Sequence, residues 1–256
     1  GDIVEVNLLT HLDEMGGDPI ALLTNGPNHT YIAQSGLVGT NGTDTAAGRP
    51  TFTSYVSDVE MNSGQDQVVL DLHYQQDGVD ITKRLTLNRG DYYIGVEYLI
   101  DNQSTENWSA AFYAQIKRDD YVPPSTGGMG MKPFVGPAIT TPEDRYKKFD
   151  FEDLEGSSFT EAVDTGWAAL LQNYFLGAWI PDPSLSMEYN LRQSAANGFY
   201  YIGFTQTPMQ VAPGGQQSLS AGFYAGPKDQ YRLRDLSEHL DLTVDYGWIW
   251  WAAQPI

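Results

Sequence analysis

Residues 67–117 read QVVLDLHYQQDGVDITKRLTLNRGDYYIGVEYLIDNQSTENWSAAFYAQIK, and apolar residues alternate with polar residues along this stretch. A period of two is typical of strands that bury one face. Asp77-Gly78 favours a tight hairpin turn, and residues 88–91 reverse the chain again. The stretch therefore predicts a meander of four antiparallel strands, whose inward rows are Val68, Leu70, Leu72 and Tyr74; Val79, Ile81, Leu85 and Leu87; Tyr92, Ile94, Val96, Tyr98 and Ile100; and Trp108, Ala110, Phe112, Ala114 and Ile116.

The apolar face of this meander has to be buried against another layer of the protein, and a second sheet is the expected layer. Further strand-like runs, each bounded by Gly, Pro, Asn or Asp, follow at 146–151, 167–172, 174–180, 186–191, 198–204 and 216–225. More than ten strands are expected in all, too many for a small immunoglobulin-like sandwich. We therefore predict a mainly β fold of two large stacked sheets, with long surface loops at 36–50 and 122–142.

Helical patterns are confined to the end of the chain. Good helix formers follow Pro227 as far as Leu236, and a second helical candidate runs from about Val244 to Ala253. The second candidate contains the densest aromatic cluster in the chain.

Composition excludes several classes of function. The 256 residues carry a formal net charge of −19, which repels nucleic acid, and they contain no cysteine for a disulfide, a thiolate ligand or a thiol nucleophile. No run approaches the ~20 apolar residues that span a bilayer, and the N-terminus lacks the features of a signal peptide. The chain begins within a strand pattern and stops after an aromatic run, which indicates a domain taken from a longer protein.

Candidate catalytic and metal-binding residues are sparse. We place His11 and His29 in polar loops and His73 on the polar face of its strand, and none has the flanking pattern of an acid–base pair. The acidic group at 150–155 lacks the spacing of a calcium loop, so it is interpreted as a solvated edge. We expect no enzyme activity, no cofactor and no metal.

Four longer motifs carry a resemblance to a known family. They lie at 87–92, 141–150, 166–181 and 239–250, where the last reads HLDLTVDYGWIW. Together they resemble the periplasmic domain of YidC-type membrane protein insertases. The resemblance implies a β-supersandwich of galactose mutarotase-like architecture with short C-terminal helices. It divides the chain into a sandwich domain at residues 1–238 and a helical connector at 239–256 that leads to the membrane-embedded insertase region.

The resemblance also implies a function. It predicts a docking and chaperone-like domain on the periplasmic side of the inner membrane of a Gram-negative bacterium. This domain assists insertion and folding of membrane proteins, with and without the Sec translocon. Its expected partners are the periplasmic Sec components, nascent membrane protein clients, its own transmembrane region and the membrane interface. The alternative left open is a carbohydrate-binding or mutarotase-like carbohydrate-modifying domain.

Two sets of site residues follow from the resemblance. The membrane-proximal connector consists of Leu240, Leu242, Val244, Tyr246, Trp248, Trp250 and Trp251. Its three aliphatic residues are expected to anchor the segment to the sandwich, and Trp250 and Trp251 are expected at the membrane interface. The partner-binding set, taken from the region between residues 112 and 148, consists of Phe112, Tyr113, Gln115, Tyr146 and Lys148.

Overall fold

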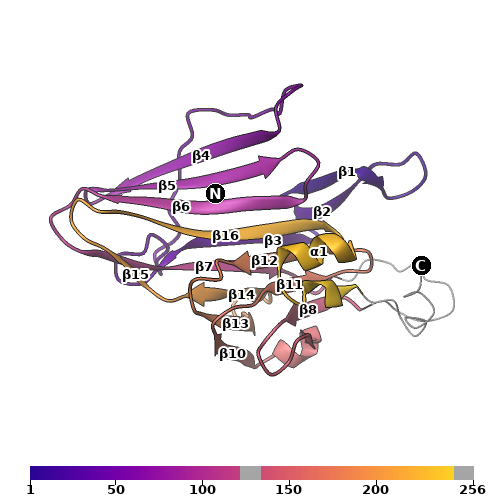
Figure 1. Ribbon diagram of the computed structural model, residues 1–256. Helices are drawn as coiled ribbons and strands as arrows, with labels where there is room; N and C mark the ends of the chain where they lie inside the picture. Colours follow the sequence, from indigo (N-terminus) through magenta and orange to yellow (C-terminus); the bar gives the residue numbers. More distant parts are fainter. Residues whose placement is uncertain (122–133, 245–256) are drawn as a thin grey trace.

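A computed structural model of the protein describes residues 1–121 and 134–244 (Figure 1). Within these ranges it forms two antiparallel sheets of eight strands each, stacked face to face. The predicted mainly β supersandwich is confirmed. The first sheet consists of β1 (Val6–Leu12), β2 (Pro19–Asn25), β3 (Thr30–Val38), β7 (Trp108–Arg118), β14 (Tyr200–Gln206), β13 (Met187–Gln193) and β10 (Ser158–Val163), with β15 (Met209–Val211) paired to β7.

The second sheet contains the chain's longest meander. It runs in the order β4 (Gln67–Gln76), β5 (Val79–Asn88), β6 (Tyr93–Asn102), β16 (Gln216–Pro227), β12 (Phe175–Pro181), β11 (Ala168–Leu171), β8 (Gly136–Ile139) and β9 (Lys147–Lys148). The hairpin between β4 and β5 has the predicted turn, because Asp77 and Gly78 both adopt positive φ, at 51° and 79°. Two consecutive residues of positive φ match the right-handed twist of the flanking strands.

The predicted four-strand meander is wrong in its last strand. β4, β5 and β6 are neighbours, but β6 pairs on its other side with β16, whereas β7 lies in the first sheet between β3 and β14. The chain changes sheets at Asn102, whose side chain is fully buried and donates hydrogen bonds to the carbonyls of Glu106 and Val211, both at 2.9 Å. These bonds satisfy a buried amide and fix the crossover.

Most residues of the predicted rows of β5, β6 and β7 meet between the two sheets, and Tyr74 of the β4 row packs against them. Leu87 is exposed, so its predicted inward position is wrong. Tyr98 of β6 contacts Phe112 of β7 with ring centroids 5.6 Å apart, and Phe112 contacts Phe204 of β14 at 6.4 Å. Trp179 and Phe223 pack beside them on the inner face of the second sheet, at 4.9 Å. Aromatic pairs at these separations add stabilisation beyond the area that they bury.

Lys83 occupies the inward row of β5 between two predicted core residues. Only 2% of Lys83 is exposed. Its Nζ donates to Ser35 Oγ on β3, at 2.8 Å, and to the Gly1 carbonyl. Burial lowers the pKa of Lys83 to about 8. The two sheets are thus joined by a polar contact through their apolar interior.

Several local predictions are corrected. Residues 136–139, expected in a loop, form β8 and pair with β11. The run at 146–151 is a strand only at β9, and it continues into a 3-10 helix, η2 (Phe151–Leu154). His11 lies in β1 rather than in a loop. Propensity alone did not indicate these elements because the strand form depends on the neighbours with which a segment pairs.

The C-terminal helix is confirmed as α1 (Gln230–Leu236), which begins at Asp229, whose carboxylate caps the Arg232 N–H. A short 3-10 helix, η3 (Leu240–Thr243), follows it. The second helical candidate falls almost entirely outside the described residues. Within the described ranges, no helix is long and apolar enough to cross a membrane.

Candidate functional site on the outer face of the second sheet

The C-terminal segment, residues 229–244, lies on the outer face of the second sheet. Leu233 and Leu240 are fully buried there, in a cluster with Trp167 and with outward residues of β11 and β12. Trp167, the residue before β11, donates its indole N–H to the Glu238 carbonyl at 3.1 Å. Arg232 of α1 forms an ion pair with Asp91 ahead of β6. The segment is therefore part of the packed domain.

The connector residues fall into three groups. Leu240 is fully buried and Val244 packs against the same cluster, as the anchoring role requires. Leu242 is 42% exposed, so its predicted anchoring role is wrong: η3 turns that side chain away from the sheet. Tyr246, Trp248, Trp250 and Trp251 lie outside the described residues.

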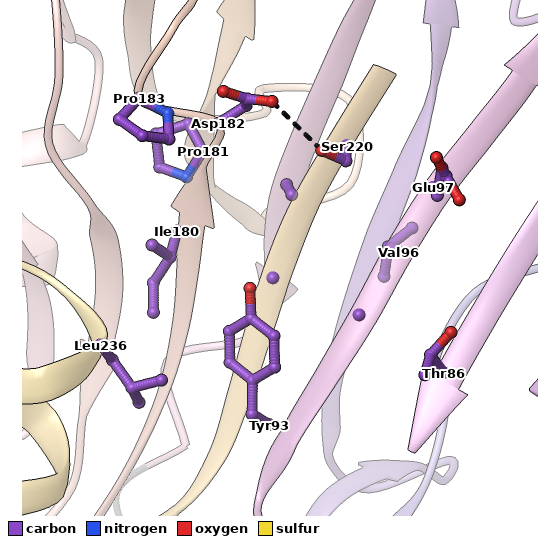
Figure 2. A pocket seen from close by; sticks show the side chains of 13 residues that line it. Thr86, Tyr93, Val96, Glu97, Ile180, Pro181, Asp182, Pro183, Ser220 and Leu236 are labelled. Atoms are coloured by element: carbon purple, nitrogen blue, oxygen red, sulfur yellow. Dashed lines mark hydrogen bonds between the residues drawn. The ribbon is translucent and has the colours of Figure 1, made fainter. Parts of the chain in front are cut away.

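A pocket of about 420 Å³ opens beside α1, in the face of β5, β6, β16 and β12 (Figure 2). Its floor is one row of residues in register across these strands: Thr86, Gly95, Gly222 and Ile180. Two glycines side by side leave no side chains above the backbone, so the pleated surface is hollow there. A Cβ at Gly222 would overlap the Tyr93 phenol. The glycines thus make room both for the pocket and for Tyr93.

Polar groups surround this floor. Asp182 accepts hydrogen bonds from the Ser184 hydroxyl at 2.6 Å, the Ser184 N–H at 2.9 Å and the Ser220 hydroxyl at 3.3 Å. These bonds, the Ser184 hydroxyl first, lower the pKa of Asp182, so it is ionised at neutral pH. Glu97 stands on the β6 side of the pocket, across from Asp182 (Figure 2). Two carboxylates, a phenol and hydroxyls suit a ligand that donates hydrogen bonds and has one flat apolar face.

A second pocket, of about 560 Å³, lies on the other side of Leu236. The two pockets share Ile180, Pro181, Pro183 and Leu236 as a common wall. The second is also lined by Arg145 and by Glu238 and His239, which approach each other to 3.3 Å. The end of α1 therefore separates two hollows of the same sheet face.

The histidines predicted to have no catalytic role, His73 and His29, form local contacts in the structure. His73 lies on the outer face of β4, as predicted, and contacts Thr82 Oγ1 at 3.1 Å. His29, in the loop before β3, pairs with Asp119 at 2.8 Å, and Asp119 also accepts the Thr30 N–H. None of the described histidines lines the glycine-floored pocket. In the described ranges, no group of three His, Asp or Glu residues is arranged to hold a metal ion.

The predicted partner-binding residues are not brought together. Phe112 has no exposed surface, so its inclusion is wrong: it fills the space between the sheets. Tyr113 and Gln115 alternate with it on the outer face of β7, in the first sheet. Lys148 lies in β9 of the second sheet and Tyr146 directly precedes this strand; the Lys148 Nζ is 5.1 Å from the Tyr146 ring centroid.

Sequence reasoning missed the pocket residues Tyr93, Asp182 and Ser220. The available signal was glycine at outward positions 95 and 222 of otherwise apolar strands, together with the Pro-Asp-Pro turn at 181–183. A glycine inside a strand marks a close approach or a hollow. Cross-strand register is needed to know that the two glycines are neighbours.

Comparison with known proteins supplies the family. A family model described as the YidC periplasmic domain matches residues 1–256. The membrane protein insertase YidC of Cellvibrio japonicus is 50% identical over 258 residues, which cover 100% of this chain and 47% of that protein. The YidC of Saccharophagus degradans is 43% identical over 259 residues, covering 100% and 46%. The chain spans about half the length of these curated relatives.

Two solved structures illustrate a distant likeness. The Slr1438 protein from Synechocystis sp. PCC 6803 has a TM-score of 0.45 at 11% identity, covering 69% of this chain and 66% of that one. A galactose mutarotase related enzyme from Lactobacillus acidophilus has a TM-score of 0.43 at 8% identity, covering 69% and 71%. Likeness at this level carries no information on function.

The family match covers all the motifs on which the resemblance was based, and the relatives' identity extends over the full chain. The two-sheet sandwich with its packed C-terminal segment is the fold that the resemblance implied. The chain belongs to the YidC periplasmic domain family.

Proposed function

We propose that this chain is a docking and chaperone-like domain of an inner-membrane protein insertase, on the periplasmic side of a Gram-negative bacterium. In this role it assists insertion and folding of membrane proteins, with and without the Sec translocon, and performs no catalysis of its own. Family membership supports the proposal, as do relatives that are named membrane protein insertases and are about twice as long.

The observation that carries the proposal is the packing of residues 229–244 on the second sheet. A connector at 239–256 that is anchored through Leu240 and Trp167 would hold the sandwich in a fixed relation to the insertase's own transmembrane region. In this arrangement Trp250 and Trp251 contact the membrane interface, where an indole's apolar body and polar N–H are both accommodated.

The partner surface is proposed to include Tyr113, Gln115, Tyr146 and Lys148. A photo-crosslinking amino acid at each position of the full-length insertase is expected to yield adducts with periplasmic Sec components or with nascent clients. Tyr174 is 70% exposed and serves as the matched control position. Adducts identified by mass spectrometry at the four positions but not at Tyr174 support the docking role. Absence of adducts at all four, or equal adducts at Tyr174, contradicts it.

The carbohydrate-binding alternative is favoured by one observation, the glycine-floored pocket with Tyr93, Asp182 and Glu97. Carboxylates accept hydrogen bonds from sugar hydroxyls, and an aromatic ring packs on the apolar face of a sugar ring. Under the docking role, titration with galactose, glucose and maltose followed by calorimetry is expected to give no saturable heat. Saturable binding that Asp182→Asn abolishes would instead establish the alternative.

A further inference from the structure

Among the described strands, β4 is the outermost of the second sheet and pairs with one neighbouring strand, β5 (Figure 1). It pairs with β5 over its whole length, from Gln67 opposite Asn88 to Gln76 opposite Val79. On its other side, the described residues contribute only a single bridge, between Thr53 and His73. A ten-residue edge strand that is bridged at one position and otherwise lacks a partner among the described residues is a template for a further strand.

The bridge at His73 shows which backbone groups of β4 face outward. The His73 N–H donates to the Thr53 carbonyl at 2.7 Å, and the His73 carbonyl accepts the Thr53 N–H at 2.9 Å. Because this orientation repeats every second residue, the N–H and C=O groups of Val69 and Asp71 face the same way. In the described part of the chain no hydrogen bond to the backbone of either residue comes from this side. The outer edge of β4 therefore pairs with extended backbone at His73. At Asp71 and Val69, its outward N–H and C=O groups have no partner among the described residues.

Apolar side chains are exposed beside the vacant positions. Val69 is 42% exposed, and Tyr55 and Val56, just beyond the bridge, are 91% and 52% exposed. Tyr55 reaches the edge itself, because its ring lies 4.9 Å from the His73 ring. Exposed apolar groups along a free sheet edge provide side-chain contacts for an added strand.

The charges around this edge are mainly negative. Asp58, Glu60 and Asp66 are exposed in the segment that leads into β4. The nearby cations already have partners: Arg84 pairs with Asp71 at 2.7 Å, and Arg89 donates to the carbonyls of residues 61, 62 and 65. The electrostatic complement of this surface is a segment with basic residues.

We propose that the free edge of β4 binds an extended polypeptide segment of apolar residues with basic flanks, added as an antiparallel strand beside Gln67–Asp71. Main-chain hydrogen bonds to Val69 and Asp71 supply affinity, and the exposed apolar groups select the side chains. This inference does not depend on the insertase role, because it concerns the chemistry of the segment rather than its source.

The test uses this chain and a fluorescein-labelled peptide, Lys-Lys-Val-Thr-Val-Thr-Val-Lys, followed by fluorescence anisotropy. Saturable binding is expected. A peptide of the same sequence that is N-methylated at all of its Val and Thr residues is expected to bind at least about tenfold more weakly, because neither of its edges can donate N–H groups to β4. Equal binding of the two peptides, or no saturation up to millimolar concentration, overturns the proposal.

A variant locates the site on the chain. Val69→Pro removes one outward N–H, and proline is tolerated on edge strands. It is expected to weaken binding of the parent peptide at least about tenfold. Tyr231→Ala, at a 75% exposed tyrosine of α1, is the matched control and is expected to bind normally. Circular dichroism verifies that each variant is folded. If Val69→Pro does not fold, the comparison of the parent and N-methylated peptides still tests whether binding depends on main-chain hydrogen bonds. Undiminished binding by a folded Val69→Pro variant contradicts the assignment to β4.

Discussion

Trp167→Ala is expected to lower the free energy of unfolding by about 3–5 kcal/mol, the usual cost of truncating a buried tryptophan. Trp167 has no exposed surface and fills the cluster between the second sheet and the C-terminal segment. The substitution leaves a cavity under Leu233 and Leu240 and removes the donor to the Glu238 carbonyl. Urea denaturation followed by circular dichroism measures the change.

A pair of conservative variants separates the packing of the Trp167 ring from the hydrogen bond by which it holds the C-terminal segment. Trp167→Phe keeps an aromatic ring but loses the N–H, so residues 229–244 are expected to become more susceptible to limited proteolysis. Trp179→Phe is the matched control, because Trp179 is as fully buried as Trp167 but lies between the two sheets, and its indole N–H has no hydrogen-bond partner among the described residues. If both variants release the C-terminal segment at the same rate, the Trp167–Glu238 contact does not hold it.

The second large effect is the pH dependence of the free energy of unfolding, which we expect to depend on Lys83. With a folded-state pKa of about 8 and an ordinary value of 10.5, the unfolded chain holds more protons than the native one between these values. Stability therefore rises with pH across this window. The contribution of Lys83 between pH 7 and pH 9.5 is about 2 kcal/mol. At pH 7 both states are protonated, and the native state bears the desolvation of a buried ammonium.

Lys83→Met is expected to abolish this rise, because methionine fills a similar volume without a charge. The free energy of unfolding in urea is measured for variant and wild type at pH 7 and at pH 9.5. The difference between the two proteins is then compared at the two pH values, because the titration of all other groups largely cancels in that difference. Lys117→Met, at a half-buried lysine on the outer face of β7, controls for the loss of one positive charge and is expected to retain the rise. A Lys83→Met variant that follows the wild-type pH dependence would show that Lys83 is not the responsible group.

Much of the local structure was predictable from the sequence. The alternation in 67–117 identified four strands and most of the residues that they turn inward, although Leu87 is exposed, and Asp77-Gly78 identified the hairpin. The helix that follows Pro227 was indicated by its residue types. These features depend on neighbours a few residues apart, and a single sequence displays such relations directly.

The candidate site could be predicted only in part. The C-terminal segment was singled out, and Leu240 is buried as its anchoring role requires, but Leu242 points away from the sheet and Phe112 is enclosed between the sheets. The pocket beside α1 was not foreseen, because Gly95, Gly222 and Asp182 are brought together by strand pairing and not by sequence spacing.

By itself, the sequence determined that this protein is a mainly β sandwich, which residues face inward along its main strands, and to which family it is similar. Only the tertiary structure decided that β7 leaves the meander for the other sheet, that Lys83 bridges the two sheets, and that two glycines form a hollow beside α1. The physical reason is that alternation records which face of a strand is buried, whereas backbone hydrogen bonds are chemically the same between any two strands. The choice of neighbour is therefore made by the packing of whole sheets, to which residues far apart in the chain contribute together.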